Sequence, residues 1–392
     1  MGITMNTFEI DKEYIAGTYG RFPVEIVGGK GSVLYGGDGK EYIDMGSGIA
    51  VNTFGACDDV WADAIKEQIG KIQHTSNLYY TLPCARLAEE LCKRTGMKKV
   101  FFSNSGAEAN ECAIKAARAY AEKKKGKGHY TVITLENSFH GRTLTTLAAT
   151  GQDKFHADFT PLTDGFVYAK ANDFESVKAL AEKYSCAAVM IEVVQGEGGI
   201  NVLTEEFVKK VRAYTEEKDM LLIVDEVQTG NGRTGKLYGY MNYGITPDVF
   251  STAKGLGGGL PIGATLLGEK VKDIFTPGSH GSTFGGNPVC CAAALSVITR
   301  FDENLMAEIN EKSEYIRASL EGQDGVASVT GLGLMLGIEV TKRSASEIIN
   351  SLIERGVLVL SAKNKIRLLP PLNIPFETLE KAIKIIKEEL AK

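Results

Sequence analysis

Features that mark metalloproteins, membrane proteins and nucleic-acid-binding proteins are scarce in this sequence of 392 residues. Its seven cysteines form no C-x-x-C pair, which argues against structural zinc and dithiol redox motifs. No apolar run is long enough to span a bilayer, and the net charge of −5 gives no basic field that would attract nucleic acid or anionic lipid. The first ten residues lack the charged and then apolar pattern of a signal peptide. We therefore expect a reduced, cytoplasmic enzyme that uses no metal, nucleic acid or membrane.

Glycine, in contrast, is abundant with 44 residues, and the hydrophobic content of 44% is enough for one large core and one smaller core. Along the middle of the chain, apolar segments alternate with glycine-containing polar loops and helical patterns. The predicted strands of this part cover 99–103, 130–135, 187–193 and 221–225, and the helix after the first strand extends to about 125. Strand, loop and helix in this order predict an α/β fold with a mostly parallel sheet, whose polar loops gather along one edge.

The two ends of the chain have a different pattern. Residues 33–45 predict a β-hairpin, and residues 335–391 predict a compact α+β unit with strands at 335–340, 357–360 and 366–369. A single helix is predicted over 295–320, and others over 60–70, 82–95, 207–218, 345–355 and 378–391. We expect a small domain formed by 1–58 and 302–392, and a large cofactor-binding domain at 59–301.

The segment from Leu221 to Lys254 carries the clearest chemical signal. Leu221–Asp225 predicts a buried strand that ends in an acid, and a second apolar segment brings Lys254 to a glycine-rich loop. A lysine that forms a Schiff base and an acid that keeps the pyridine nitrogen protonated are what pyridoxal phosphate requires. Taken singly, the acid has a commoner explanation as a helix cap or metal ligand, and the lysine as a solvated charge.

Two further strand ends carry side chains that suit such a cofactor. Ser105 and Glu108 match a capping box, which leaves the amides near Gly106 and Ala107 free to bind a phosphate at the start of a helix. Phe139 follows another strand and can stack on a flat ring. An ordinary capped helix and core packing of the phenyl ring are the alternatives for these two features.

A competing motif lies at residues 230–236, whose sequence GNGRTGK has the spacing of a phosphate-binding P-loop and follows an apolar strand. A nucleotide-dependent switch is therefore an alternative function. The next residue should be Ser or Thr, to reach magnesium, but it is Leu237, and acids separate the strand from the loop. We interpret this match as accidental.

Together the motifs resemble those of the class III, fold type I aminotransferases, and within that family they are most similar to those of the acetylornithine aminotransferases. They extend from residues 18–23 (TYGRFP) to 367–372 (RLLPPL). Between these lie 102–111 (FSNSGAEANE), 139–143 (FHGRT), 195–199 (QGEGG), 225–230 (DEVQTG), 253–259 (AKGLGGG) and 280–288 (HGSTFGGNP). The resemblance covers nearly the whole chain.

The resemblance implies a role for each matching residue. Lys254 would form the Schiff base and carry the proton, and Asp225 would pair with the pyridinium. The cofactor pyridoxal 5'-phosphate would also be bound by Ser105, Gly106, Ala107, Phe139, Val227 and Gln228. Thr283 would reach the phosphate of the neighbouring subunit, which implies a homodimer with shared sites. The substrates would be bound by Arg142, Ser282, Glu197 and Arg367, with Arg367 holding an α-carboxylate and Glu197 pairing with it when the other substrate is bound.

The implied reaction transfers the terminal amino group of N-acetylornithine to 2-oxoglutarate, giving N-acetylglutamate 5-semialdehyde and glutamate in arginine biosynthesis. Enzymes of the family that act on 4-aminobutyrate or succinylornithine share nearly every motif and stay open as alternatives. Free-ornithine enzymes usually carry a tyrosine where Gly48 stands, and its absence leaves room for an acyl group. Residues 56–59 (ACDD) depart from the usual His-x-His-Pro, although their acids still predict a helix start.

Overall fold

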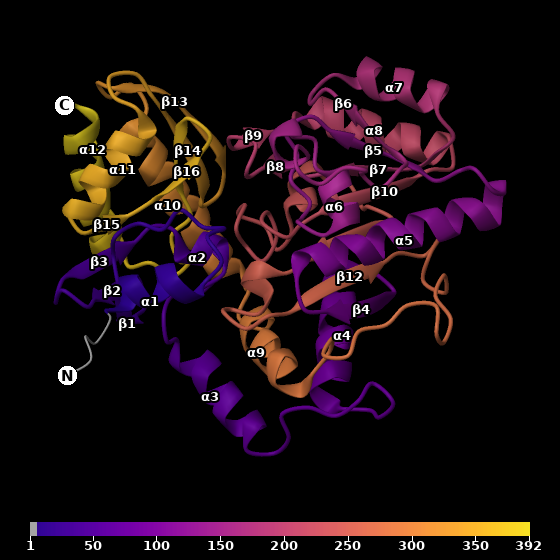
Figure 1. Ribbon diagram of the computed structural model, residues 1–392, viewed down its shortest axis with the longest axis horizontal. Coiled ribbons are helices and arrows are strands. Elements are labelled where there is room, and N and C mark those ends of the chain that lie inside the picture. Colours follow the sequence, from indigo (N-terminus) through magenta and orange to yellow (C-terminus); the bar gives the residue numbers. More distant parts are fainter. Residues whose placement is uncertain (1–5) are drawn as a thin grey trace.

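A seven-stranded sheet forms the centre of the computed structural model, which describes residues 6–392. Figure 1 shows this sheet and its helices on the right, in magenta and orange, and the two ends of the chain together on the left. In spatial order the strands are β4 (Lys99–Ser103), β12 (Gly263–Leu267), β11 (Val249–Thr252), β10 (Leu221–Asp225), β7 (Cys186–Ile191), β5 (Thr131–Leu135) and β6 (Phe166–Ala169).

The strands from β11 to β6 run parallel to one another, whereas β12 pairs antiparallel with both β11 and β4. The prediction of a mostly parallel α/β sheet is therefore confirmed. Every residue of β10 is buried, as expected for a strand covered by helices on both faces. Helices α5 (Gly106–Lys125), α7 (Phe174–Lys183) and α8 (Glu205–Glu217) pack on this sheet, and α6 (Leu144–Ala149) packs beside α5 and β6.

The N-terminal and C-terminal strands share a second sheet. Its order is β1 (Ile26–Lys30), β2 (Val33–Gly36), β3 (Glu41–Asp44) and β15 (Val357–Leu358), in which β3 and β15 are parallel and the predicted hairpin is formed by β2 and β3. A third sheet contains β13 (Val326–Leu332), β14 (Met335–Val340), β17 (Lys365–Leu368) and β16 (Leu360–Ala362). The domain boundaries at 58/59 and 301/302 stay a prediction. The first five residues of the predicted small domain lie outside the described part of the chain.

Among the helices at the two ends of the chain, side-chain caps mark the starts of α1 (Thr7–Tyr14), α3 (Asp59–Ile69) and α11 (Ala345–Glu354). The N-terminal side also contains α2 (Ser47–Ala50) and α4 (Leu82–Thr95), and the C-terminal side α12 (Phe376–Leu390). Asp58 accepts a hydrogen bond from the Trp61 amide at 3.0 Å, so the expected helix start is present despite the altered loop. Within residues 6–392 no helix is long and apolar enough to cross a membrane.

Two predictions about the C-terminal part are wrong. The single helix over 295–320 is two helices, α9 (Pro288–Ile298) and α10 (Glu303–Leu320), because Asp302 caps the second one through the Leu305 amide at 2.8 Å. The strand over 357–360 is divided between β15 and β16, which belong to different sheets. Strands β6, β12 and β13 and the short hairpin of β8 (Val194–Gln195) and β9 (Asn201–Val202) had no prediction.

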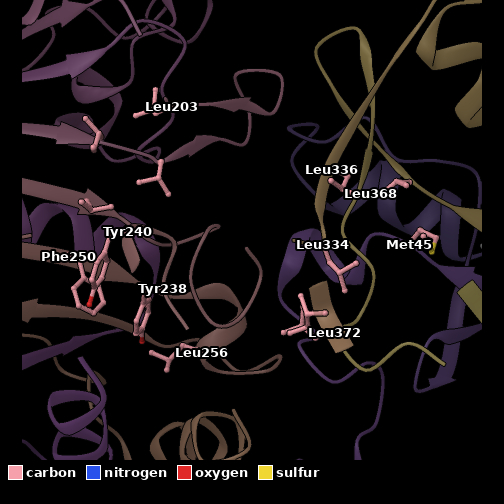
Figure 2. Close-up of a cluster of buried hydrophobic side chains, with 14 of the residues drawn as sticks. Met45, Leu203, Tyr238, Tyr240, Phe250, Leu256, Leu334, Leu336, Leu368 and Leu372 are labelled. Atoms are coloured by element: carbon pink, nitrogen blue, oxygen red, sulfur yellow. The ribbon is translucent and has the colours of Figure 1, made fainter. Parts of the chain in front are cut away.

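Buried apolar side chains fill both halves of the molecule, and most of them belong to one large cluster, with two smaller clusters besides it. Figure 2 shows Tyr238, Tyr240, Phe250 and Leu256 together beside strands of the large sheet, and a second group opposite them. The labelled members of that second group are Met45, Leu334, Leu336, Leu368 and Leu372. Both groups are nearly inaccessible to solvent, so each half of the molecule has a buried apolar interior.

Candidate active site

A cavity of about 630 Å³ opens where the parallel strands end at their carboxyl termini. This volume lies within the range of small-molecule and cofactor sites, and the position is the one at which open α/β sheets bind ligands. The predicted site residues that line the cavity are Ser105, Gly106, Ala107, Phe139, Arg142, Glu197, Asp225, Val227, Gln228 and Lys254. Segments separated by more than a hundred residues therefore meet at one place.

Asp225 is the last residue of β10, and its carboxylate is almost completely buried. Its Oδ2 accepts hydrogen bonds from Asn110 Nδ2 at 2.7 Å and His140 Nδ1 at 2.8 Å, and its Oδ1 accepts one from the Val227 amide at 3.0 Å. Burial acts to lower the pKa of His140, but the hydrogen bond and charge of Asp225 outweigh it and raise that pKa above its ordinary value. The acid is thus fixed in one orientation, ready to face a cationic ring nitrogen.

Lys254 follows β11 and begins the short 3-10 turn η3 (Lys254–Leu256). Its backbone lies in the left-handed region at φ 38°, which is strained for a residue with a side chain and recurs at functional sites. The next peptide is held by Thr53, whose hydroxyl donates to Gly255 O at 2.7 Å. Burial lowers the pKa of Lys254, partly opposed by the charges of Glu197 and Asp225. Lys254 therefore loses its proton more easily than an ordinary lysine, and its neutral amine can act as a nucleophile.

The start of α5 forms a cradle for an anion. Ser105 caps the helix as predicted, since its hydroxyl accepts from the Glu108 amide at 3.2 Å. The reciprocal half of the predicted capping box is wrong, because Glu108 accepts from the Asn104 amide at 2.8 Å and leaves the Ser105 amide free. Within residues 6–392 the amides of Gly106 and Ala107 also donate to no acceptor. This donor set fits a phosphate group.

Gly106 is required at this cradle for a steric reason. A Cβ atom at this position would lie 2.6 Å from the Val227 side chain, so only glycine lets the helix start approach the loop after β10 so closely. Val227 and Phe139 both line the cavity, which gives a flat ring two apolar contacts. The residues present therefore fit the phosphate, the ring and the ring nitrogen of pyridoxal phosphate.

Arg367 lies on β17 and reaches toward the loop that follows β7. Its Nη1 donates to Glu197 Oε1 at 2.6 Å and to Gln228 Oε1 at 3.2 Å, while its Nε is buried without a partner among the described residues. Burial acts to raise the pKa of Glu197, but the charge and hydrogen bond of Arg367 lower it below its ordinary value. The guanidinium thus keeps donor capacity that a substrate carboxylate can use.

Three other predicted residues lie differently. Arg142 is exposed at the cavity, with its guanidinium 4.2 Å from the ring centre of Phe155. Ser282 does not line the cavity of its own chain, and its hydroxyl accepts from Asn104 Nδ2 at 3.2 Å and from the Gly285 amide at 3.0 Å. Thr283 is exposed and also lies outside the cavity. Their contacts with substrate and with a neighbouring subunit stay predictions.

Asn110, His140 and Glu192 belong to the site although they had no predicted role. Glu192 is buried, its Oε1 accepts from the Phe139 amide at 2.8 Å, and burial raises its pKa. It follows the apolar strand β7 as Asp225 ends β10, so the same signal of an acid at a strand end was available. Asn110 and His140 occur within the matching motifs, but no sequence pattern indicated their role, because their contacts with Asp225 join distant segments.

The P-loop alternative does not fit the structure. The next helical element after residues 230–236 is the 3-10 turn η2 (Gly239–Tyr243), whereas a P-loop runs into the N-terminus of an α-helix. Residues 230–235 are buried, so their amides do not surround an accessible anion site. The segment has a structural use instead, through the side chain of Arg233.

Comparisons with known proteins agree with this geometry. The model of the family Aminotransferase class-III matches residues 14–390. The chain is 46% identical over 384 residues to the acetylornithine aminotransferase of Haemophilus ducreyi, covering 98% of each chain. It is similar in structure to the ornithine aminotransferase of Toxoplasma gondii ME49, with a TM-score of 0.94, 30% identity and coverage of 98% and 94% of the two chains. For the N-acetylornithine aminotransferase of Stenotrophomonas maltophilia K279a these values are 0.84, 33%, 97% and 98%. The chain belongs to the class III aminotransferases, whose cofactor is pyridoxal phosphate.

Proposed function

We propose that this aminotransferase takes the terminal amino group of N-acetylornithine and gives it to 2-oxoglutarate, forming N-acetylglutamate 5-semialdehyde and glutamate in cytoplasmic arginine biosynthesis. The observation that carries the proposal is the set of side chains around one cavity. Asp225 and Lys254 supply the acid and the amine, and the start of α5 supplies anion-binding amides. Arg367 lies behind the lining, where it contacts the lining residues Glu197 and Gln228 and would supply a carboxylate-binding fork. The relatives named acetylornithine aminotransferase support the choice of donor.

When bound, pyridoxal phosphate supplies an aldehyde that accepts an amino group and a ring that withdraws electrons from the neighbouring carbon. The Gly106 and Ala107 amides and Ser105 would hold its phosphate, and Gln228 would contact its hydroxyl. Asp225 would hold a proton at the ring nitrogen by placing a fixed negative charge against it. Asn110 and His140 keep that carboxylate in place through their two hydrogen bonds.

Lys254 would move the proton in both half-reactions. Its Nζ is uncharged more readily than that of an ordinary lysine because burial lowers its pKa. In one half-reaction the amine takes a proton from Cδ of the donor, and in the other it delivers a proton to Cα of the new glutamate. The strained backbone of Lys254 fixes the direction from which the amine approaches.

The pair of Glu197 and Arg367 would let one cavity accept two substrates. In the donor half-reaction Glu197 neutralises the guanidinium, as it does in this structure at 2.6 Å. In the acceptor half-reaction the α-carboxylate of 2-oxoglutarate replaces Glu197, and the exposed Arg142 binds the distal carboxylate. The exchange gives specificity without a second binding site.

Gly48 favours an acylated donor. It lies at φ 65°, where a side chain is strained, and the nearest atoms to an added Cβ are 3.7 Å away in Val51 and Asn52. Val51, three residues later, lines the cavity. The glycine therefore leaves space near the donor end where an acyl group can lie.

A homodimer is the second part of the proposal. Leu78, Tyr79, Tyr80 and Leu82 are highly exposed in the loop before α4 and at its start, and Phe284 is exposed next to Thr283. Asn77 ties these two segments together, since its side-chain amide donates to Ser282 O at 2.9 Å and Gly285 O at 3.0 Å. A second copy of the chain would cover this apolar surface and bring Thr283 to the neighbouring phosphate.

Steady-state kinetics with four donors tests the substrate proposal. N-acetylornithine should give a kcat/KM at least about tenfold higher than succinylornithine, ornithine or 4-aminobutyrate, which corresponds to about 1.4 kcal/mol. A preference for 4-aminobutyrate would overturn the donor assignment while leaving the mechanism in place. Bound cofactor is checked separately by the visible absorbance of the purified protein and by borohydride fixation to Lys254.

Mixed dimers test the shared site. Subunits carrying Lys254→Ala are combined with subunits carrying Thr283→Val, each inactive or impaired alone. If Thr283 acts across the interface, each heterodimer has one site with both changes and one site with neither, so activity returns. Activity that stays at the level of the parents would show that Thr283 serves its own subunit.

A further inference from the structure

The loop 230–236 follows β10 of the large sheet and packs against segments from the N-terminal and C-terminal parts of the chain. The turn between β13 and β14 approaches it so closely that a Cβ atom at Gly333 would lie 2.5 Å from the Thr234 carbonyl carbon. The Leu334 amide donates to Arg233 O at 2.9 Å. Leu334, Leu372 and Met45, which lie near one another in Figure 2, belong to the segments that this loop contacts.

The side chain of Arg233 crosses from this loop into those segments and is almost fully buried there. Its Nη1 donates to Pro370 O at 2.6 Å and to Leu334 O at 3.1 Å, and its Nη2 lies 3.4 Å from Ser47 Oγ. One planar guanidinium thus joins three segments that are remote in sequence. A lysine cannot reproduce these contacts, because its single ammonium lacks the fixed fork of donors.

The contacts of Arg233 lead directly to Arg367. Pro370 lies three residues after Arg367, at the point where the chain leaves β17. The peptide between them is held as well, because Leu369 donates to Met45 O at 2.7 Å and accepts from Ser47 Oγ at 2.6 Å. The exit of β17 is therefore fastened by one guanidinium and one hydroxyl that also contact each other.

The same junction holds a strained turn beside the cavity. Residues 47–50 all lie in the left-handed region, with φ between 42° and 65°, and three of them carry side chains. Asp44 fixes this turn by accepting from the Gly46 amide at 2.9 Å and the Ser47 amide at 2.7 Å. Burial lowers the pKa of Arg233 to about 9, with the charge of Asp44 opposing the shift, so the guanidinium stays charged at pH 7.

We infer that Arg233 is a positioning residue for the acceptor half-reaction, which places Arg367 by fastening the exit of β17 to the Ser47 turn. This inference rests on the proposed role of Arg367 as the α-carboxylate ligand. Since N-acetylornithine reacts while Arg367 is paired with Glu197, a displaced Arg367 impairs the reaction with glutamate or 2-oxoglutarate and spares the reaction with the donor. A residue that only stabilises the fold would affect both half-reactions alike.

The test measures each half-reaction separately in the cofactor-loaded enzyme, by the change of the visible spectrum after mixing with N-acetylornithine or with glutamate. Arg233→Lys should slow the glutamate half-reaction at low substrate by about tenfold or more and change the N-acetylornithine half-reaction by less than about threefold. Ser47→Ala removes one contact of the junction and should give a smaller shift in the same direction. Arg212→Lys is the control, because Arg212 is largely buried and paired with Asp248 at 2.6 Å outside the cavity lining. It should change both half-reactions equally or leave them unchanged.

Arg367→Lys, measured in parallel, separates the inference from the proposed function. If Arg367→Lys impairs the glutamate half-reaction selectively and the Arg233 and Ser47 variants do not, Arg233 is only a structural residue and the inference is overturned. If Arg367→Lys impairs both half-reactions alike, the proposed role of Arg367 fails and takes the inference with it. Should Arg233→Lys fail to bind cofactor, the Ser47→Ala result decides between these outcomes.

Discussion

Asp225 and Arg367 are both buried, charged and close to the same cavity, but their surroundings differ. Asp225 accepts three protein hydrogen bonds, from Asn110, His140 and Val227, and these occupy both of its oxygens. Arg367 uses Nη1 for two acceptors, Glu197 and Gln228, and leaves its buried Nε without one. The acid is held in place through both oxygens, and Oδ1, with a single donor, can still accept from a ring nitrogen, whereas the guanidinium retains donors for an incoming group.

This difference matches two separate tasks of the proposed site, which are to hold a cofactor and to bind two alternating substrates. A cofactor that stays bound benefits from a fixed charge in a rigid frame, since no reorganisation is then needed during the reaction. Two substrates that alternate need a partner that can be exchanged, and in the proposed mechanism Glu197 is that partner. Changes at Asp225 or Lys254, the cofactor end of the cavity, should therefore impair both half-reactions. Changes at Arg367 or Glu197, the Arg367 end, should impair one half-reaction more than the other.

The largest effect is expected for Lys254→Ala, which removes the residue that we propose as both nucleophile and proton carrier. We expect kcat to fall by about 10⁴-fold or more in both half-reactions. Borohydride should no longer fix the cofactor to the chain. Thermal unfolding of the cofactor-free protein should be unchanged or shifted upward, because an amine whose pKa is lowered by burial is lost. A selective loss of one half-reaction would contradict the fixed role of this residue.

Asp225→Asn tests whether the charge, rather than the shape, matters at the cofactor end. Removing the charge should lower kcat by about 10²–10³-fold in both half-reactions, as for the loss of one preorganised electrostatic contact. The pKa of His140 provides an independent readout by NMR. Without the carboxylate, burial dominates, and the pKa should change from above its ordinary value to below it. A His140 titration that stays unchanged would show that another group holds this proton.

The cofactor end was predictable from sequence to the extent that its signals are local. Asp225 and Lys254 follow short apolar strands, and Gly106 opens a helix after another, so each could be placed at a strand end and hence at one sheet edge. The partners of Asp225 could not be placed in this way. Asn110 and His140 meet it across 115 and 85 residues of sequence, and no local pattern encodes such contacts.

Local patterns also failed where one continuous sequence pattern covers two separate elements of the structure. The apolar residues of 295–298 and 305–320 continue a helical period across the break at 299–302, and only the Asp302 cap shows that a second helix begins. Residues 357–362 satisfy a strand pattern throughout, yet tertiary pairing assigns β15 and β16 to separate sheets. The P-loop spacing at 230–236, interpreted as accidental because of Leu237, has a packing explanation: added Cβ atoms at Gly230, Gly232 and Gly235 would meet Tyr238, Phe301 and Asn310.

Arg367→Lys should separate the two half-reactions. The KM for 2-oxoglutarate is expected to rise by about 10–100-fold, because an ammonium cannot form the bidentate contact and charged hydrogen bonds contribute about 1.5–3 kcal/mol. The N-acetylornithine half-reaction should change by less than about threefold. Stopped-flow spectra of each half-reaction measure both values. Equal losses in the two would place Arg367 with the fixed cofactor end and remove the basis of the comparison.

Glu197→Gln has the smallest expected effect, on stability and its pH dependence. Arg367 lowers the pKa of Glu197 below its ordinary 4.5 in the folded chain, so the ionised carboxylate stabilises the fold above that value. This contribution is lost as the pH falls through the folded-state pKa, where wild type and variant should unfold alike. At pH 7 the variant should be less stable by about 1–2 kcal/mol, the range for a hydrogen bond between charged groups. Urea unfolding at pH 7 and pH 3.5, both without cofactor, measures the two differences. A gap that persists undiminished at the lower pH would mean that Glu197 stabilises the chain through packing, and that its exchange with a substrate carboxylate has no electrostatic basis.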